Sequence, residues 1–278
     1  MQGQNSYPKV ILKPSKGWLG INLPEIWRYR ELIYFLTWRD IKVRYKQAVL
    51  GIAWAVLQPV LTMAITSVVF GYLLKVSSGD VPYPVFVMAA LLPWHLFSTS
   101  LQKSSQSLVG NAHLLTKIYF PRLIIPVSSV LAVMLDFAIS FLVLIATMMI
   151  YKTYPTWNIF WLIPLTFLAV LAALAVGLWL SALNVQYRDV QHMVPFIIQI
   201  WMYASPVVYS IDIIPAGIFR TLYGLNPMVG VVQGFRWALF GGSAPDLTLL
   251  ISTLVVLILF ISGLYYFRRM EKTFADIV

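Results

Sequence analysis

The sequence contains no cysteine and few charged residues. Without cysteine there is no disulfide framework, no thiolate nucleophile and no zinc site built on cysteine ligands. Charged residues make up 11% of the 278 residues, whereas a water-soluble domain carries about 25%. Because hydrophobic residues make up 60%, the composition excludes an ordinary soluble globular protein and indicates a chain that crosses a membrane several times.

Motifs that bind phosphate or carry out hydrolysis are also missing. The chain has no G-x-x-x-x-G-K-[ST] loop, no G-x-G-x-x-G, no H-E-x-x-H and no G-x-S-x-G. The three histidines, His95, His113 and His192, lie in separate segments, which disfavours a metal site. We therefore expect no catalytic residue, no metal and no cofactor in this chain. Residues Met1 to Gly20 lack the apolar core of a signal peptide, so we expect the membrane spans themselves to direct insertion.

Long uncharged runs predict six membrane-spanning helices, since a helix needs about 20 largely apolar residues to cross the hydrocarbon layer. The runs lack the alternating pattern of a β-barrel strand, so the expected fold is an all-α membrane protein. The expected spans are at about residues 51–74, 84–107, 124–150, 160–183, 192–210 and 247–267. The chain then divides into an N-terminal segment of residues 1–48, a transmembrane domain of residues 49–270 and a tail of residues 271–278.

Lysine and arginine are distributed unevenly over the two sides that six spans define. The side that holds both termini has sixteen of the 20 basic residues, and the other side has four, Lys75, Lys152, Arg220 and Arg236. Positive residues accumulate on the cytoplasmic side of membrane proteins. Both termini are therefore expected in the cytoplasm.

The N-terminal segment contains a predicted amphipathic helix at about residues 24–46. Plotted at 100° per residue, it carries Arg28, Glu31, Arg39, Lys42 and Lys46 on one face and Tyr29, Leu32, Ile33, Leu36 and Val43 on the other. We expect this helix to lie along the cytoplasmic interface, where its cations attract anionic headgroups. It either anchors the chain to the membrane surface or couples a cytosolic partner to the first span.

A short, partly apolar stretch from Gly110 to Arg122 lies on the expected cytoplasmic side. It has the length for one or two helical turns and is closed by Pro121. Such an element can sit in a socket on a cytosolic motor and transmit its movement, and the alternative is a simple connecting loop. The candidate coupling residues are Gly110, His113, Leu114, Lys117, Tyr119, Pro121 and Arg122.

The expected extracytoplasmic segment from Ile211 to Asp246 is broken by proline and glycine, yet it is too apolar for a solvated loop. Two short helices that dip back into the outer half of the membrane, as a re-entrant hairpin between spans five and six, would satisfy both features. Such hairpins commonly line an exit. The candidate gate residues are Pro215, Arg220, Asn226, Pro227 and Arg236.

Asp136 is the only acidic residue deep inside an expected span, where an isolated charge costs roughly 2.5–3.5 kcal/mol. It should face protein or water, in a structural or cavity-lining role or as a proton relay. Aromatic residues within spans could pack in the core, or could line a smooth path on which sugar rings slide. The candidates for a channel lining are Trp54, Trp94, Phe97, Asp136, Trp201, Tyr203 and Tyr209.

Several motifs occur in a fixed order along the chain. They are RYKQAVLGIAWAVLQP (Arg44 to Pro59), LLPW (Leu91 to Trp94), LNVQYRDV (Leu183 to Val190), SPVVY (Ser205 to Tyr209) and LNPM (Leu225 to Met228), followed by Phe235-Arg236. With six expected spans and a basic N-terminal helix, the chain resembles the membrane subunits of polysaccharide ABC exporters. These are the O-antigen and teichoic-acid exporter permeases of the type-two ABC transporter class. The resemblance runs from about residue 25 to the C-terminus, and residues 1–24 carry no family motif.

The resemblance implies a homodimer that binds two copies of a separate ATP-binding subunit, which would hold ATP and magnesium. It also implies a bacterial cytoplasmic (inner) membrane location and a substrate glycan linked to a polyprenyl pyrophosphate lipid, moved to the outer leaflet. The cations Arg39, Lys42, Arg44 and Lys46 would attract the lipid phosphate. Residues 110–122 would match the coupling element and residues 213–240 the outer gate. No nucleic-acid partner is expected.

Two other classes of protein stay open from the residues alone. An exporter of drugs or small lipids would share the type-two architecture. An intramembrane glycosyltransferase or acyltransferase would need polar catalytic groups that converge near an interface. Beyond Asp136, Arg188-Asp189 and His192, the chain offers few such groups.

Overall fold

The computed structural model describes residues 23–46, 52–215, 217–242, 244–245, 247–271 and 274. All regular secondary structure in these ranges is helical, which confirms the all-α prediction for the described part of the chain. Residues 1–22, most of the predicted tail at 271–278 and Gly51, the first residue of the first expected span, lie outside the described residues.

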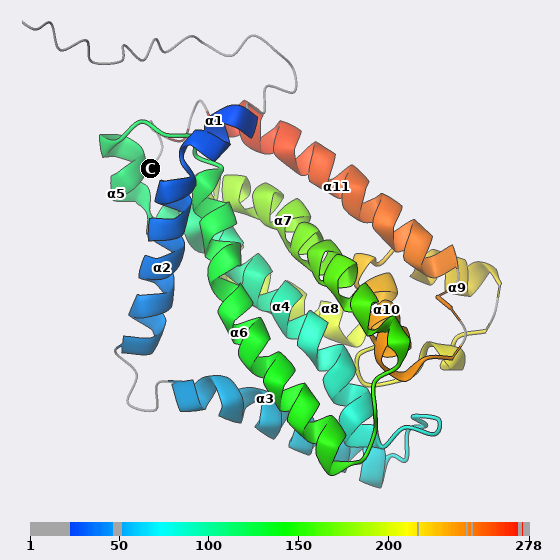
Figure 1. Cartoon of the computed structure of the whole chain (residues 1–278). Coiled ribbons are helices and arrows are strands. Elements are labelled where there is room, and N and C mark those ends of the chain that lie inside the picture. The colour runs from blue at the N-terminus through cyan, green and yellow to red at the C-terminus, as the bar shows by residue number, and fades with distance from the viewer. Residues whose placement is uncertain are drawn as a thin grey trace, which may run out of the picture.

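The helices follow one another along the chain with short connections (Figure 1). They are α1 Leu23–Arg28, α2 Arg30–Lys46, α3 Ile52–Thr66, η1 Ser67–Leu73, α4 Tyr83–Gly110, α5 Ala112–Lys117, α6 Ile124–Ile150, η2 Trp157–Trp161, α7 Leu162–Gln186, α8 Val190–Tyr203, η3 Ile211–Ile213, α9 Ile218–Tyr223, α10 Pro227–Phe240 and α11 Leu247–Glu271.

Five helical segments in the described residues are long and apolar enough to cross a membrane. They are Ala53–Leu73, Tyr83–Gly110, Ile124–Ile150, Trp157–Gln186 and Leu247–Glu271, and each overlaps one of the expected spans. The remaining expected span, at about 192–210, differs from the structure. Its helix α8 has 14 residues, or about 21 Å, which is shorter than the hydrocarbon layer of about 30 Å.

The α8 helix ends at Tyr203 because the sequence that follows breaks the helical hydrogen-bond pattern. Pro206 has no N–H to donate, and a residue that precedes a proline is pushed out of the helical region of backbone space. Residues 204–210 therefore form turns, although they are as apolar as the helix before them. The hydrophobic pattern therefore predicts a span to about residue 210, whereas the helix ends at Tyr203.

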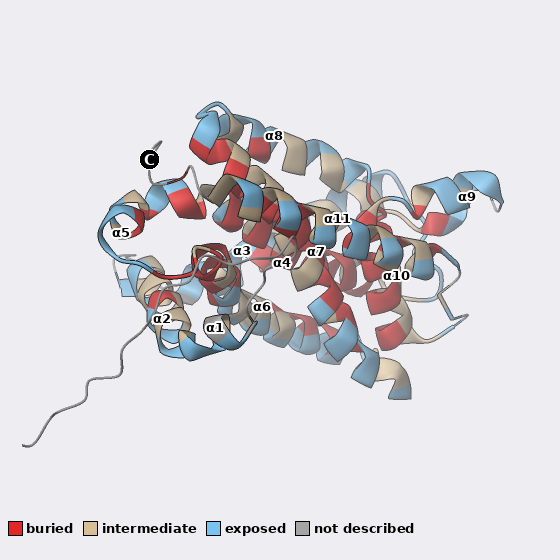
Figure 2. Cartoon of the chain, turned by 90° about the horizontal axis from the view of Figure 1, so that it is seen from above, coloured by how far each residue is buried: buried red, intermediate tan, exposed pale blue. Residues whose placement is uncertain are grey.

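Helix α4 lies at the centre of the fold and packs against α6, α7 and α10, while α11 packs on α7 and α10 (Figure 1). Viewed from above, buried positions gather on the central helices, and exposed positions prevail on α9 and much of α8 (Figure 2). Most of α4 is buried, from Val85 to Phe97 and beyond. Within Ala53–Leu73, which covers η1 and α3 from Ala53 onward, Pro59 alone is buried and the other residues are exposed or partly exposed. The exposed α3 surface is apolar, as expected for contact with lipid or with another protein.

Helix α2 packs along α6, with Leu36 buried between them. Tyr29, Leu32 and Ile33 pack against a core cluster that includes Leu36. Val43, which was expected on the same face, is exposed. The outward side carries aromatic as well as charged side chains. The exposed aromatic residues are Trp27, Tyr34, Phe35 and Trp38. The position of this helix at the membrane interface stays a prediction.

Candidate functional site

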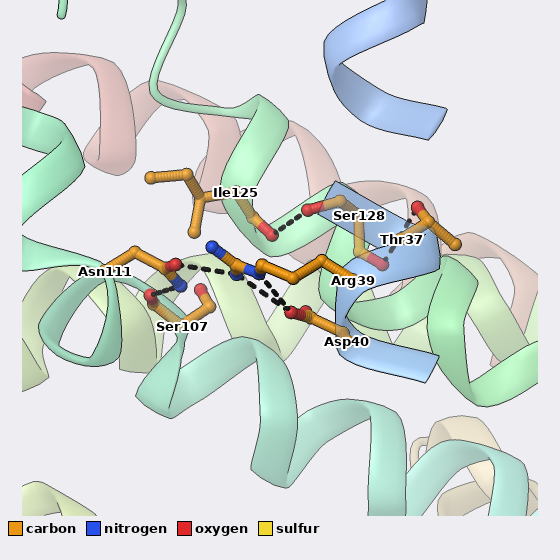
Figure 3. A network of polar contacts seen from close by, with 7 residues as sticks. All are labelled: Thr37, Arg39, Asp40, Ser107, Asn111, Ile125 and Ser128. Carbon is orange, nitrogen blue, oxygen red and sulfur yellow. Dashed lines mark hydrogen bonds and ion pairs between the residues drawn. The ribbon is translucent and has the colours of Figure 1, made fainter. Parts of the chain in front are cut away.

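Arg39 connects three helices at the expected cytoplasmic end (Figure 3). Its guanidinium donates to Oδ1 of Asn111, at the junction of α4 and α5, at 2.8 Å, and to the carboxylate of its neighbour Asp40 at 2.8 Å. Asn111 in turn donates to a main-chain carbonyl one turn earlier on α4 at 2.8 Å. Thr37 donates to the carbonyl of Ser128 on α6 at 3.4 Å. Movement of the α4–α5 junction is therefore linked by hydrogen bonds to α2 and α6.

The stretch from Gly110 to Arg122 contains the short helix α5 and a connection to α6. Leu115 and Phe120 are buried in a core cluster, so this segment is packed against the body of the protein. The backbone N–H of Arg122 also donates to the Glu271 carboxylate at the end of α11, at 3.2 Å. Of the predicted coupling residues, Gly110, His113, Lys117 and Tyr119 are exposed, Leu114 and Arg122 are partly buried and Pro121 is buried.

Asp136 is paired with two residues at the end of α2. Its carboxylate accepts hydrogen bonds from the guanidinium of Arg44 and from the hydroxyl of Tyr45. The Arg44 and Asp136 side chains are 26% and 27% exposed. Burial raises the pKa of the Tyr45 phenol, against the opposing effect of the Arg44 charge, so the hydroxyl stays protonated and can donate. The charge that looked isolated in the sequence is compensated by a helix distant in the chain.

The four cations expected to attract lipid phosphate fall into two groups. Arg39 and Arg44 turn inward and bond to protein acceptors, as described above. Lys42 and Lys46 are exposed, and the Lys42 ammonium lies 5.5 Å from the ring centroid of Trp38. The helical-wheel pattern grouped Arg39 with the lysines because it takes no account of acceptors on other helices.

Arg44, Tyr45 and Asp136 stand in the wall of a cavity of about 560 Å³ between α2, α3, α4 and α6. Trp54, 51% exposed, contributes from α3. The remaining lining residues are Ala55, Gln58, Pro59, Leu92, His95, Leu96, Thr99, Gln102, Lys103, Val133, Phe137 and Ser140. The cavity thus combines apolar walls with several polar groups inside the bundle.

Two of the predicted channel-lining aromatics, Trp94 and Phe97, are buried in the core, at 2% and 0% exposure. The Phe97 ring lies 5.1 Å from that of Trp201 in an edge-to-face arrangement. Their placement corresponds to core packing, the alternative that the sequence left open. Tyr203 is exposed, and its carbonyl accepts a hydrogen bond from the Tyr209 hydroxyl at 3.0 Å.

Asn226 fixes the start of α10 against the end of α8. Its Oδ1 accepts from the backbone N–H of Met228 at 3.0 Å, as a helix cap does, and from the indole N–H of Trp201 at 2.8 Å. Its Nδ2 donates to the carbonyl of Ala204 at 2.8 Å and to Ser205 Oγ at 2.9 Å. All hydrogen-bonding groups of this amide side chain are therefore engaged with the protein.

Arg236 on α10 stabilises the turns that follow α8. It donates to the carbonyls of Pro206, Val207 and Tyr209 at 2.7, 2.8 and 3.0 Å. Its guanidinium carbon also lies 3.6 Å from the ring centroid of Phe86 on α4. The arginine thus provides hydrogen-bond partners for carbonyls in the turns after α8, which have no helical partner.

The other predicted gate residues lie around these contacts. Pro227 is buried in the first turn of α10, and Pro215 is exposed. Arg220 on α9 donates to the Asp212 carboxylate at 3.3 Å. The Tyr209 and Tyr223 hydroxyls are 2.7 Å apart, and burial, reinforced by this hydrogen bond and by Tyr209, raises the pKa of Tyr223 despite the opposing charge of Arg236.

The cavity includes polar residues that the sequence did not single out. Gln58 stands alone among apolar residues, and His95 lies in a different segment from the other two histidines. Thr99, Gln102 and Lys103 lie in the polar stretch at the end of the second expected span. In the ranges the structure describes, no group of three or more histidine, aspartate or glutamate side chains could hold a metal ion. The spacing of His95, Thr99, Gln102 and Lys103 along α4 places them on one helical face, which is a signal that the sequence contained.

Comparison with known proteins identifies the family. A family model described as "ABC-2 type transporter" matches residues 31–240. The chain belongs to the ABC-2 type transporter family. It is therefore a multi-pass membrane protein of a transport system, as its apolar helices indicate.

Curated relatives of this ABC-2 chain include two proteins named O-antigen export system permease protein RfbA. The one from Myxococcus xanthus is 32% identical over 252 residues, which cover 89% of this chain and 96% of the relative. The one from Klebsiella pneumoniae is 30% identical over 249 residues, which cover 89% and 95%. The polysialic acid transport protein KpsM of Escherichia coli is 23% identical over 240 residues, which cover 84% and 91%.

Proposed function

We propose that this chain is the permease subunit of an ATP-driven exporter that moves a lipid-linked polysaccharide from the cytoplasmic to the outer leaflet of a bacterial inner membrane. The observation that carries the proposal is similarity over nearly the full length of two permeases named for O-antigen export. A third relative is named for the transport of another polysaccharide, polysialic acid. A glycan carried on a polyprenyl pyrophosphate fits both the relatives and the sequence motifs.

In this proposal two copies of this chain form a homodimer, which binds two copies of a separate subunit. That subunit binds ATP and magnesium and hydrolyses the ATP. The α5 segment is the proposed contact for that subunit. His113, Lys117 and Tyr119 are exposed, whereas Leu115 and Phe120 of the same segment are buried in the core. The hydrogen bonds of Arg39 with Asn111 offer a route by which a push on α5 reaches α2.

Six crossings with both termini in the cytoplasm are part of the proposal. The fifth crossing would consist of α8 together with the turns at residues 204–210. Non-helical backbone at membrane depth is tolerated only where protein satisfies its polar groups. Arg236 and Asn226 supply such partners here, which supports this assignment. Helices α9 and α10 would then form the outer gate.

The exposed cations Lys42 and Lys46 are the proposed attraction for anionic lipid headgroups. Each contributes about 1 kcal/mol near an anionic surface, and salt weakens the effect. Arg39 and Arg44 are proposed to hold α2 to the rest of the permease instead, because their donors are already engaged.

The proposed function is tested by deleting the gene and by purifying the tagged protein in mild detergent. We expect loss of a surface glycan with unchanged drug sensitivity, and co-purification of a P-loop ATPase. Normal surface glycan with increased drug sensitivity would instead indicate a drug or small-lipid exporter. A preparation without a second polypeptide or ATP turnover would contradict the proposal, as would a purified chain that chemically alters a glycan lipid.

A further inference from the structure

The cavity between α2, α3, α4 and α6 is polar along one side, at a depth where polar groups are costly. Asp136 lies about 18 Å along the axis of α6 from its first residue, near the middle of a helix about 40 Å long. On α4, His95, Thr99 and Gln102 follow one another on the face that lines the cavity. Polar side chains at such positions in membrane proteins usually serve a substrate or ion path.

Most of these polar groups have no partner within the protein. The Nε2 atom of His95 is buried and accepts or donates no hydrogen bond among the described residues. Within the same part of the chain, the side chains of Gln58, Thr99 and Gln102 also make no hydrogen bond, although Asn226 and Asn111 elsewhere are engaged. A buried polar atom without a partner costs about 1–3 kcal/mol, so the His95 Nε2 atom is unfavourably placed unless something enters the cavity. Gln58 is exposed and Thr99 and Gln102 are partly exposed, so their polar groups are accessible to a ligand.

The chemistry of the wall determines what can enter. Two amides, a hydroxyl and an imidazole offer both donors and acceptors, which is the pattern that matches hydroxyl groups. The exposed Trp54 ring adds an aromatic surface against which the C–H face of a sugar ring can pack. The volume of about 560 Å³ lies in the range of small-molecule sites.

The charges of the wall disfavour a phosphate in the same place. Arg44 is already neutralised by Asp136, which leaves Lys103 as the unpaired cation among the described lining residues, and Lys103 is exposed. The Arg44–Asp136 pair carries no net charge, so it gives a phosphate deep in the cavity no unpaired cation to compensate its charge. An uncharged ligand rich in hydroxyl groups needs no such partner.

We infer that this cavity is a sugar-binding subsite within a single subunit, which holds uncharged sugar residues of the transported glycan through Gln58, His95, Thr99, Gln102 and the Trp54 ring. The inference rests on the proposed export function and adds to it where the glycan is held and by which groups. The site lies inside one chain, so it does not require the homodimer to be complete.

The test uses the purified complex of the permease with its ATPase in lipid nanodiscs and two photoreactive probes. One probe is an alkyl glucoside and the other an alkyl phosphate, with the same diazirine-bearing chain. Labelled residues are identified by mass spectrometry, with and without excess unreactive alkyl glucoside. The variants are Gln102→Leu and the isosteric Thr99→Val, and the control is Gln106→Leu, one turn further along α4 and absent from the cavity wall.

We expect the glucoside probe to label residues that line the cavity and to be displaced by the unreactive glucoside. Gln102→Leu should lower this labelling about threefold to tenfold, as expected when one or two neutral hydrogen bonds are lost, and Thr99→Val about threefold. Gln106→Leu should stay within about twofold of the natural protein. The two site variants differ in volume change, so Thr99→Val reports on the site even if Gln102→Leu does not assemble.

Three outcomes would overturn the inference. Stronger labelling by the phosphate probe would make the cavity a site for a phosphate headgroup. Labelling that neither Gln102→Leu nor Thr99→Val reduces would show that the polar side chains do not bind the glucoside. Absence of displaceable labelling would indicate a water-filled cavity. In each case, loss of surface glycan after gene deletion would still support the export function, so failure of the site and failure of the function are distinguished.

Discussion

Replacing the partners of the Arg44–Asp136 pair tests whether α2 is held to the transmembrane bundle by charge. The variants are Arg44→Gln, Asp136→Asn and the double change. Asp136→Ala is added because it also removes the acceptor of the Tyr45 hydroxyl. Both side chains are about three-quarters buried, and the pair joins helices separated by 92 positions in the chain.

The size of the effect follows from the exposure of the pair. Removing one partner of a fully buried pair costs about 3–5 kcal/mol, whereas a fully exposed pair contributes about 0–1 kcal/mol. With 26% and 27% of the two side chains exposed, we expect each single substitution to lower the free energy of unfolding by about 2 kcal/mol, and Asp136→Ala by about 3 kcal/mol. The double variant should lose about 1–2 kcal/mol less than the sum of the single losses.

Unfolding is followed by tryptophan fluorescence as a denaturing detergent is titrated into mixed micelles, with protease cleavage of α2 as a local measurement. The matched control is Asp212→Asn, which removes an acidic partner that is 81% exposed and should change stability by less than about 1 kcal/mol. Additive single effects, within about 0.5 kcal/mol, would refute the conclusion that Arg44 and Asp136 stabilise each other.

Three further predictions concern packing, capping and coupling. In Gly263→Ala the new Cβ would lie 2.7 Å from a main-chain carbonyl oxygen of α7, so the free energy of unfolding, measured by thermal unfolding, should fall by about 1–3 kcal/mol. Gly110 has open space at the position of a Cβ, so Gly110→Ala should leave the free energy of unfolding unchanged or raise it by up to about 1 kcal/mol. Asn226→Ala should cost about 1–3 kcal/mol in the same assay because α10 loses its cap, and Asn226→Asp, which keeps the acceptor, should cost less. Arg39→Gln should lower the amount of glycan exported per ATP hydrolysed at least about threefold in reconstituted vesicles, without abolishing ATP hydrolysis. Arg30→Gln, at an exposed position, should leave this ratio unchanged, and equal ratios in the two variants would contradict a coupling role for Arg39.

The sequence predicts the orientation of the N-terminal helix only in part. The apolar spacing of Tyr29, Leu32, Ile33 and Leu36 is a local property, and these residues do contact the protein core. The direction of Arg39 could not be predicted, because its acceptor Asn111 is 72 positions away in the chain. A helical wheel describes one helix in isolation, whereas an arginine turns to where its charge is best compensated.

The end of α8 shows a second limit. Hydrophobicity extended the expected span to residue 210, and only backbone geometry at Ser205-Pro206 ends the helix at Tyr203. The proline was visible in the sequence, but prolines also occur inside α3 and α4 without ending them. After Pro206 the turns are stabilised by Arg236, from another helix, which donates to three of their carbonyls.

The sequence by itself determined that this is an all-helical membrane protein of a transport family, since long apolar runs and ordered motifs are properties of neighbouring residues. The tertiary structure alone decided that Trp94 and Phe97 are core residues, that Asp136 has a cationic partner, and that Gln58, His95 and Gln102 share one cavity. These outcomes depend on which faces of distant helices meet. Packing sets that choice, and a linear pattern of hydrophobicity does not encode it.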